Sequence, residues 1–199
     1  LFAAWEKVTF RIFGLARRDA RTKVGEYTRL AHQLVNDISL TTEEAAAAIT
    51  ALGSDYSGSK AVSAMHHSDA LHGWEDELRY FFYHYDQHLA TQHGQPFDSE
   101  QWAAIFQKPV GQVVECIYPE NPQNGWANMA ESRRESVYYL GNLLVISPRV
   151  NVLTANKPFA NKCELYEQFA KVLATQEVIT NDSWTYSRSE ERRVGKECF

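Results

Sequence analysis

The sequence predicts an α+β fold in which a mainly helical N-terminal part is followed by a small ββα module. Three observations lead to this prediction. Apolar residues recur at helical spacing over most of residues 1–108, β-branched residues then cluster in two short runs, and a further helical pattern follows the second run. We therefore divide the chain into a helical connector, residues 1–108, and a second domain, residues 109–187.

Composition limits the class of protein. The chain has 199 residues, of which 44% are hydrophobic and 13% aromatic, and its formal net charge is −5. Such a composition is typical of a folded domain and argues against disorder. No apolar run reaches the length of about 18 residues that a membrane span needs. Three cysteines at irregular spacing suit a reducing compartment, so we expect a cytoplasmic protein without membrane contacts.

The first helices are expected near the N-terminus. Residues 1–13 and 24–38 carry apolar side chains at i, i+3 and i+4 spacing, which is typical of amphipathic helices. Thr41 followed by Glu44 is a capping box, and it precedes an alanine-rich helix that Gly53 ends. The chain opens inside a helical pattern, so we expect it to be the C-terminal part of a longer protein.

An aromatic helix is expected over residues 74–94, and Ser99 is expected to cap a shorter helix after it. His84 and His88 lie four residues apart on the long helix, a spacing that can bind metal. No further ligand residue accompanies them in a recognisable motif, so packing is the favoured interpretation.

The second domain begins with a β-rich run at residues 113–118 that Pro119 ends, and a loop rich in Asn, Pro and Gly follows. A second β-like run covers residues 143–146, and residues 159–173 have helical spacing. The expected order is strand, long loop, strand, helix.

The last residues, 188–199, differ from the rest of the chain. The run RSEERRVGKEC resembles the in-frame translation of a common sequencing adapter, so we expect this segment to be non-native and leave it out of functional reasoning. A genuine charged tail is the alternative.

Three motifs in the second domain belong together. They are ECIYPE at residues 115–120, LGNL at residues 140–143, and Asn151 followed by F-x-x-K-x-x-x-Y at residues 159–166. In order and spacing they resemble the C-terminal nuclease domain of GmrSD-type restriction endonucleases, members of the HNH (His-Me finger) superfamily. The resemblance covers residues 109–187.

The resemblance implies a bacterial restriction or phage-defence protein. Its module would have a ββα-metal fold and hydrolyse phosphodiester bonds of DNA, in some family members modified phage DNA. The family joins this module to an N-terminal ParB-like nucleotidase domain, which this chain does not contain. Any nucleotide dependence would act through that domain.

The resemblance also implies roles for individual residues. Glu115 and Asn151 would hold Mg²⁺, a hard ion that oxygen ligands suit. Position 116 would carry the general base, which Asn142 would orient. Lys162 would either contact phosphate or be an ordinary surface lysine.

Position 116 departs from the family pattern, because it is Cys where the family has His. All seven histidines precede residue 94, so the second domain supplies no substitute. A thiol is a poor general base, since its pKa near 8.5 leaves little thiolate at neutral pH and a neighbouring carboxylate opposes ionisation. Decay of the site, a selected inactive member and a damaged sequence are all open explanations.

Two functions follow from this substitution. The first is a metal-dependent DNA endonuclease whose activity is impaired by Cys116. The second is a catalytically inactive module that retains the nuclease fold and binds DNA or docks a partner. Whether the chain is an enzyme therefore depends on what Cys116 permits.

Overall fold

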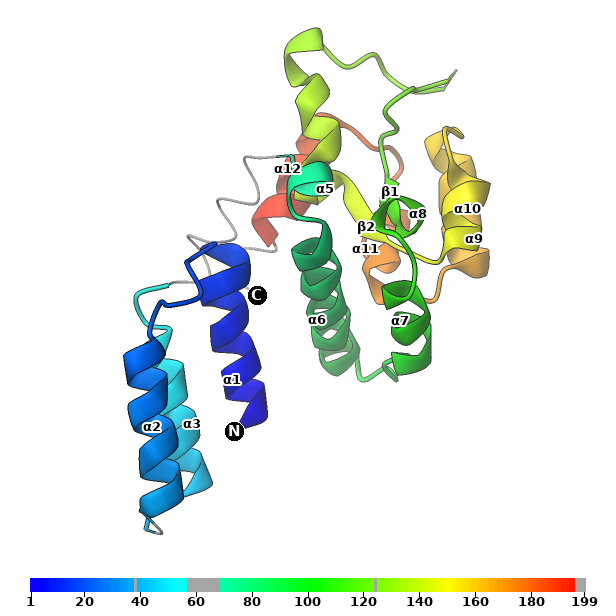
Figure 1. The fold of residues 1–199 in the computed structure, drawn as a ribbon. Helices are drawn as coiled ribbons and strands as arrows, with labels where there is room; N and C mark the ends of the chain where they lie inside the picture. The colour runs from blue at the N-terminus through cyan, green and yellow to red at the C-terminus, as the bar shows by residue number, and fades with distance from the viewer. Residues whose placement is uncertain (38, 57–68, 124, 196–199) are drawn as a thin grey trace. The chain divides into compact units, whose positions relative to one another are not determined.

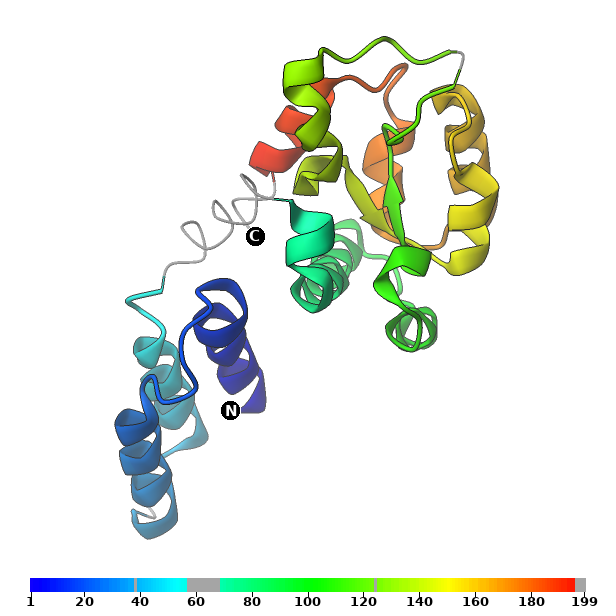
Figure 2. The same ribbon diagram turned by 45° about the horizontal axis from the view of Figure 1, so that its top comes forward.

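A computed structural model gives the fold of the chain (Figures 1 and 2). It describes residues 1–37, 39–56, 69–123 and 125–195. The chain divides into two compact units, Leu1–Ala64 and Met65–Phe199. Within the second unit, the long helix contacts the second strand. Among the described residues, no helix is both long and apolar enough to cross a membrane.

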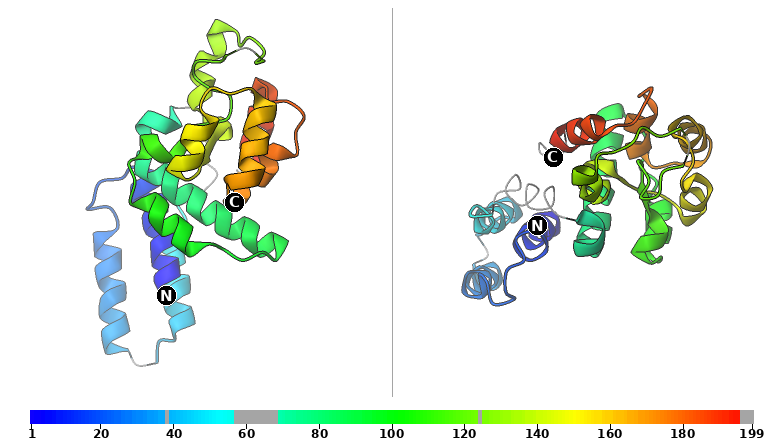
Figure 3. Two further views of the ribbon diagram at one scale, coloured as in Figure 1. Left: turned by 90° about the vertical axis from the view of Figure 1, so that its right-hand side faces the viewer. Right: turned by 90° about the horizontal axis from the view of Figure 1, so that it is seen from above.

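The first unit consists of helices that run alongside one another (Figures 1 and 3). They are α1 (Phe2–Thr9), a π-helical continuation (Phe10–Leu15), α2 (Val24–Asn36) and α3 (Thr42–Leu52). Their apolar faces meet in a core of Val8, Ile12, Leu30 and Ile49. The predicted helices are thus confirmed, and the first is extended by a π-helical turn.

The start of α3 is fixed by the predicted capping box. The Glu44 amide donates to Thr41 Oγ1 at 3.2 Å, and the Thr41 amide donates to Glu44 Oε2 at 2.9 Å. These two bonds satisfy amide groups that a helix start leaves without intrahelical partners. At the other end, Gly53 lets the chain approach α1 closely, because an added Cβ would lie 3.2 Å from Val8.

From residue 69, where the description of the second unit starts, four helices come first. They are α5 (Ala70–Gly73), α6 (Glu75–His93), α7 (Ser99–Phe106) and α8 (Val110–Val113). Helix α6 is the predicted aromatic helix, and it ends at Gly94, whose φ of 62° is the left-handed conformation that glycine tolerates. The cap of α7 was predicted one residue too late: the Asp98 carboxylate, not Ser99, accepts the Gln101 amide.

Two side chains of α6 show how its aromatic residues are used. The buried Asp86 accepts from the Trp102 indole at 3.0 Å, which joins α6 to α7. The ring of His84 packs edge-on against those of Tyr80 and Tyr83. The packing interpretation of this helix is therefore confirmed for His84.

A two-stranded antiparallel sheet lies within this unit. Strand β1 (Val114–Cys116) pairs with β2 (Leu143–Val145), and Glu115 lies opposite Leu144. The loop between the strands contains two 3₁₀ segments, Glu131–Tyr138 and Leu140–Asn142. Both β-rich runs predicted from sequence therefore form strands.

Helices follow the second strand. They are α9 (Pro148–Thr154), α10 (Phe159–Phe169), a 3₁₀ turn (Leu173–Thr175), α11 (Gln176–Ile179) and α12 (Tyr186–Gly195). Helix α9 was not predicted; the Ser147 hydroxyl caps it and Pro148 occupies its first position. Helices α9 and α10 contact each other, and Figure 2 shows them together beside the sheet.

Candidate functional site

The residues predicted to form the site converge on one stretch of backbone, residues 112–118, which contains β1. Asn151, Lys162 and Asn142 come from three different elements, and each donates a hydrogen bond to a backbone carbonyl of this stretch. Glu115 and Cys116 lie within it. The structure therefore brings the predicted residues together around the end of β1.

Asn151 lies on α9 and holds the start of this stretch. Its Nδ2 donates to the carbonyl oxygen of Gln112 at 3.0 Å and to that of Val114 at 3.2 Å. The amide thus joins the turn of α8 to the first residue of β1. The side-chain nitrogen of Asn151 therefore bonds to the backbone carbonyls of both chain neighbours of Val113.

Glu115 points from β1 towards α10. Its Oε1 accepts from Lys162 Nζ at 2.7 Å and from the Tyr166 hydroxyl at 2.8 Å. Lys162 and Tyr166 are four residues apart on α10 and therefore share one face of the helix. Lys162 Nζ also donates to the Cys116 carbonyl at 2.8 Å, so one ammonium group joins the side chain of residue 115 to the backbone of residue 116.

The Glu115–Lys162 pair is fully enclosed. Lys162 is 0% exposed and Glu115 is 3% exposed, so the interpretation of Lys162 as a surface lysine was wrong. Nζ donates to Glu115 and to the Cys116 carbonyl, so a phosphate contact would require these bonds to break. Burial, the largest cause, raises the pKa of Glu115 and lowers the pKa of Lys162, while their mutual attraction acts in the opposite direction on both groups.

Cys116 is the half-buried residue at the end of β1. Burial, followed by the charge of Glu115, raises the pKa of its thiol to about 12, and Glu120 and Asp69 act in the same direction. Lys162 opposes this effect but does not outweigh it. The group at the predicted base position therefore stays a protonated thiol near neutral pH.

Asn142 holds the backbone just beyond Cys116. Its Oδ1 accepts from the Tyr118 amide at 2.9 Å, its Nδ2 donates to the Tyr118 carbonyl at 2.9 Å, and its own carbonyl accepts from the Ile117 amide at 2.9 Å. Nδ2 donates further to Val137, and Oδ1 accepts from the Trp184 indole. These contacts reach residues 117 and 118, so any influence of Asn142 on residue 116 passes through the backbone.

The donor set does not fit a divalent cation at Glu115. The carboxylate already accepts from an ammonium group and a hydroxyl, and a metal bound there would leave the buried Lys162 charge without a partner. Among the residues that the structure describes, no group of three or more His, Cys, Asp or Glu side chains could hold a metal ion. We therefore assign no metal to Glu115.

Sequence reasoning missed a polar cluster elsewhere in the unit, whose carboxylates, Asp69 and Glu120, act on the Cys116 thiol through their charge. The Asp69 carboxylate contacts His72 Nδ1 at 2.7 Å, and the His72 ring lies edge-on to Tyr138 at 4.9 Å between centroids. A hydrogen bond to Glu120, the largest cause, raises the pKa of Tyr138 to about 12. The only local signal for these contacts was the three-residue spacing of Asp69 and His72, which is typical of a helix N-cap.

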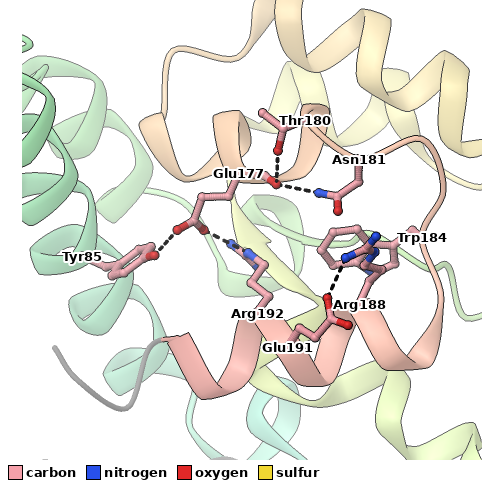
Figure 4. Close-up of a pocket in the computed structure, with 8 residues that line it drawn as sticks. All are labelled: Tyr85, Glu177, Thr180, Asn181, Trp184, Arg188, Glu191 and Arg192. Carbon is pink, nitrogen blue, oxygen red and sulfur yellow. Dashed lines mark hydrogen bonds and ion pairs between the residues drawn. The ribbon is translucent and has the colours of Figure 1, made fainter.

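A separate pocket lies between α6, α11 and α12 (Figure 4). In it the Arg192 guanidinium pairs with Glu177 at 3.1 Å, and Glu177 also accepts from the Tyr85 hydroxyl. Arg188, Glu191 and Arg192, which line one side, belong to the segment that resembles an adapter. For this reason we assign no function to the pocket.

Comparison with known proteins identifies the family. Residues 59–194 match the family described as GmrSD restriction endonucleases, C-terminal domain. No curated protein and no solved structure matches the chain. The family match includes the whole 112–118 stretch and every residue that contacts it. The chain therefore belongs to the family of C-terminal domains of GmrSD restriction endonucleases.

Proposed function

We propose that this chain is the DNA-cleaving module of a bacterial restriction system and that Cys116 makes its hydrolysis slow. The observation that carries the proposal lies at the end of β1. Lys162 and Asn142 hold the backbone of residues 116–118, while the side chain at position 116 is a thiol whose pKa is raised to about 12. The scaffold of a base position is thus retained without an effective base.

Phosphodiester hydrolysis explains why this change matters. A base takes a proton from water, the resulting hydroxide attacks phosphorus, and a phosphorus–oxygen bond to the sugar breaks, so that the sugar oxygen leaves as an alkoxide and takes up a proton from solvent. The protonated thiol of Cys116 cannot accept that proton near neutral pH. Loss of a general base typically lowers the rate by about 10²–10⁴-fold.

The resemblance implies Mg²⁺ as a cofactor, which would stabilise the charge that develops on phosphate. The contacts of Glu115 argue against this residue as its ligand, so we assign no step of the reaction to a metal. The chain's own residues hold the strand: Asn151 before it, Lys162 at its end and Asn142 beyond it.

We further propose DNA as the substrate, in keeping with a restriction endonuclease family, with modified phage DNA as the special case. A ParB-like nucleotidase domain in the longer protein would supply any nucleotide dependence. An acidic chain with a formal net charge of −5 gains little affinity for DNA from long-range attraction, which suits a module that relies on other domains for binding.

The test is cleavage of supercoiled plasmid by the full chain and by Cys116→His, each with Mg²⁺ and with EDTA. We expect Cys116→His to nick the plasmid roughly 100-fold faster, because it restores an imidazole to the base position. Cys163→His is the matched control, since it places the same group on α10 and should change nothing. If Cys116→His binds DNA and cuts no faster than the parent chain, the base position is assigned wrongly.

A second candidate function is an inactive module that binds DNA or a partner. The pairing of Glu115 with Lys162 favours it, because the carboxylate is engaged within the protein. Fluorescence anisotropy with labelled duplex DNA separates the two functions. DNA binding without cutting by either chain supports the inactive module, whereas absence of both binding and cutting contradicts a function on DNA.

A further inference from the structure

We propose that Glu115, Lys162 and Tyr166 form a positioning clamp that fixes the backbone at residue 116, and that this clamp is neither a metal site nor a phosphate site. The proposal rests on the proposed function in one respect only, because residue 116 matters as the base position. The clamp itself is defined by contacts within the protein, so it can be tested without measuring DNA cleavage.

The first support is the connectivity of the ammonium group. Lys162 Nζ donates both to Glu115 Oε1 and to the carbonyl oxygen of Cys116, at 2.7 and 2.8 Å. The Tyr166 hydroxyl donates to the same Glu115 oxygen at 2.8 Å. Because Glu115 Oε1 accepts two hydrogen bonds from one face of α10, its position is fixed. Glu115 in turn fixes the Lys162 ammonium group, which also bonds to the carbonyl of residue 116.

The second support is enclosure. Lys162 and Tyr166 are both 0% exposed. The Trp126 ring lies 5.8 Å from Lys162 Nζ, and the Trp126 indole is itself tied to the Lys157 carbonyl at 3.0 Å. A phosphate or a hydrated cation has to break these contacts and leave one buried charge unpaired, which is strongly unfavourable.

The third support is that Lys162 and Asn142 hold different backbone groups at the end of the strand. Asn142 holds the Ile117 amide and both backbone groups of Tyr118, whereas Lys162 holds the carbonyl of Cys116. The peptide group between residues 116 and 117 is thus held at both its oxygen and its nitrogen. Removing the Lys162 contact should let this peptide group open locally while the rest of the unit stays folded.

Hydrogen exchange of the full chain tests the positioning role. Lys162→Met should speed exchange of the Ile117 and Tyr118 amides roughly tenfold through a local opening that urea affects little, whereas amides in the middle of α6 exchange through global unfolding, which urea accelerates. Lys157→Met is the matched control on an exposed lysine. If exchange of Ile117 and Tyr118 in Lys162→Met depends on urea as steeply as exchange in α6, the lysine has a merely structural role and the proposal is contradicted.

Tyr166→Phe keeps this test decisive if Lys162→Met does not fold. It preserves the ring and removes only the hydroxyl contact to Glu115, so exchange at Ile117 and Tyr118 should rise by a smaller factor. Unchanged exchange at these two amides in Tyr166→Phe overturns the clamp.

Manganese binding tests the other half of the proposal. Electron paramagnetic resonance with Mn²⁺ alone should give the same titration for the full chain, for Glu115→Gln and for the exposed control Glu164→Gln. A Mn²⁺ site that is lost in Glu115→Gln and kept in Glu164→Gln would make Glu115 a metal ligand and overturn the proposal. Because the readout is binding, a chain that never cuts DNA still decides the question.

Discussion

At position 116 the environment of one side chain sets its protonation state. The Cys116 thiol is half-buried beside Glu115, and burial and that neighbouring charge together raise its pKa to about 12. The thiolate is the nucleophilic and basic form of cysteine, so this environment suppresses its chemistry near neutral pH. The surrounding residues favour a neutral group at position 116.

The same pKa shift predicts how stability depends on pH. Below pH 9 the Cys116 thiol is protonated in both states; between about 9 and 12 the unfolded chain loses this proton and the folded chain keeps it. The free energy of unfolding should therefore fall as pH rises through this window. Urea unfolding of the full chain and of Cys116→Ala, measured from pH 8 to pH 11, checks this expectation.

The difference between the two chains isolates the thiol, since Tyr138 and other groups titrate in both. The stability of Cys116→Ala relative to the parent should rise across the window. Parallel pH curves for the two chains would mean that Cys116 ionises as readily in the folded state as in the unfolded state.

At the scale of elements, one ion pair joins β1 to α10. Glu115 and Lys162 are 47 residues apart in sequence and meet only because the sheet and the helix pack together. A buried pair of this kind adds little stability relative to an apolar pair of the same shape, but losing one member leaves an uncompensated charge. The pair therefore makes the contact between β1 and α10 specific.

A double-mutant cycle measures this coupling. Glu115→Gln or Lys162→Met alone should lower the free energy of unfolding by about 3–5 kcal/mol, because each leaves a buried charge unpaired. The double variant should lose clearly less than the two single losses together. Additive losses in urea unfolding would show that the two side chains do not interact.

Sequence patterns predicted most of the helices and strands, but fewer of the contacts between them. Helical spacing, the capping box at Thr41 and the β-rich runs identified α1–α3, α6, β1 and β2 because these signals are local. The pairing of Glu115 with Lys162 was not predictable, since it depends on how β1 and α10 pack. The residues of the motif do lie around β1, and their observed contacts hold its backbone.

At the scale of the whole molecule, the chain forms two compact units, and the family match begins close to their boundary. A sequence-based boundary near residue 108 follows the change from helical to β-rich patterns. It does not reveal that α6 packs with the sheet, because the apolar face of a helix shows that the helix is buried but not which element covers it.

The C-terminal segment gives a prediction at this scale. We propose that residues 188–199 are not part of the natural domain, so a chain that ends at residue 187 should keep its free energy of unfolding within about 0.5 kcal/mol. The structure makes this a stringent test, because the Arg192 guanidinium pairs with Glu177 and donates to the carbonyl oxygens of Gly141 and Leu143. A loss of about 2 kcal/mol or more on truncation would make the segment an integral part of the fold.

The central claim is that this family member retains the scaffold of a nuclease site and lacks its base. The most direct test is the ratio of plasmid-nicking rates between Cys116→His and the parent chain under identical conditions. The structure and the chemistry of the thiol predict a ratio of roughly 100 or more. A parent chain that cuts as fast as Cys116→His would contradict the claim.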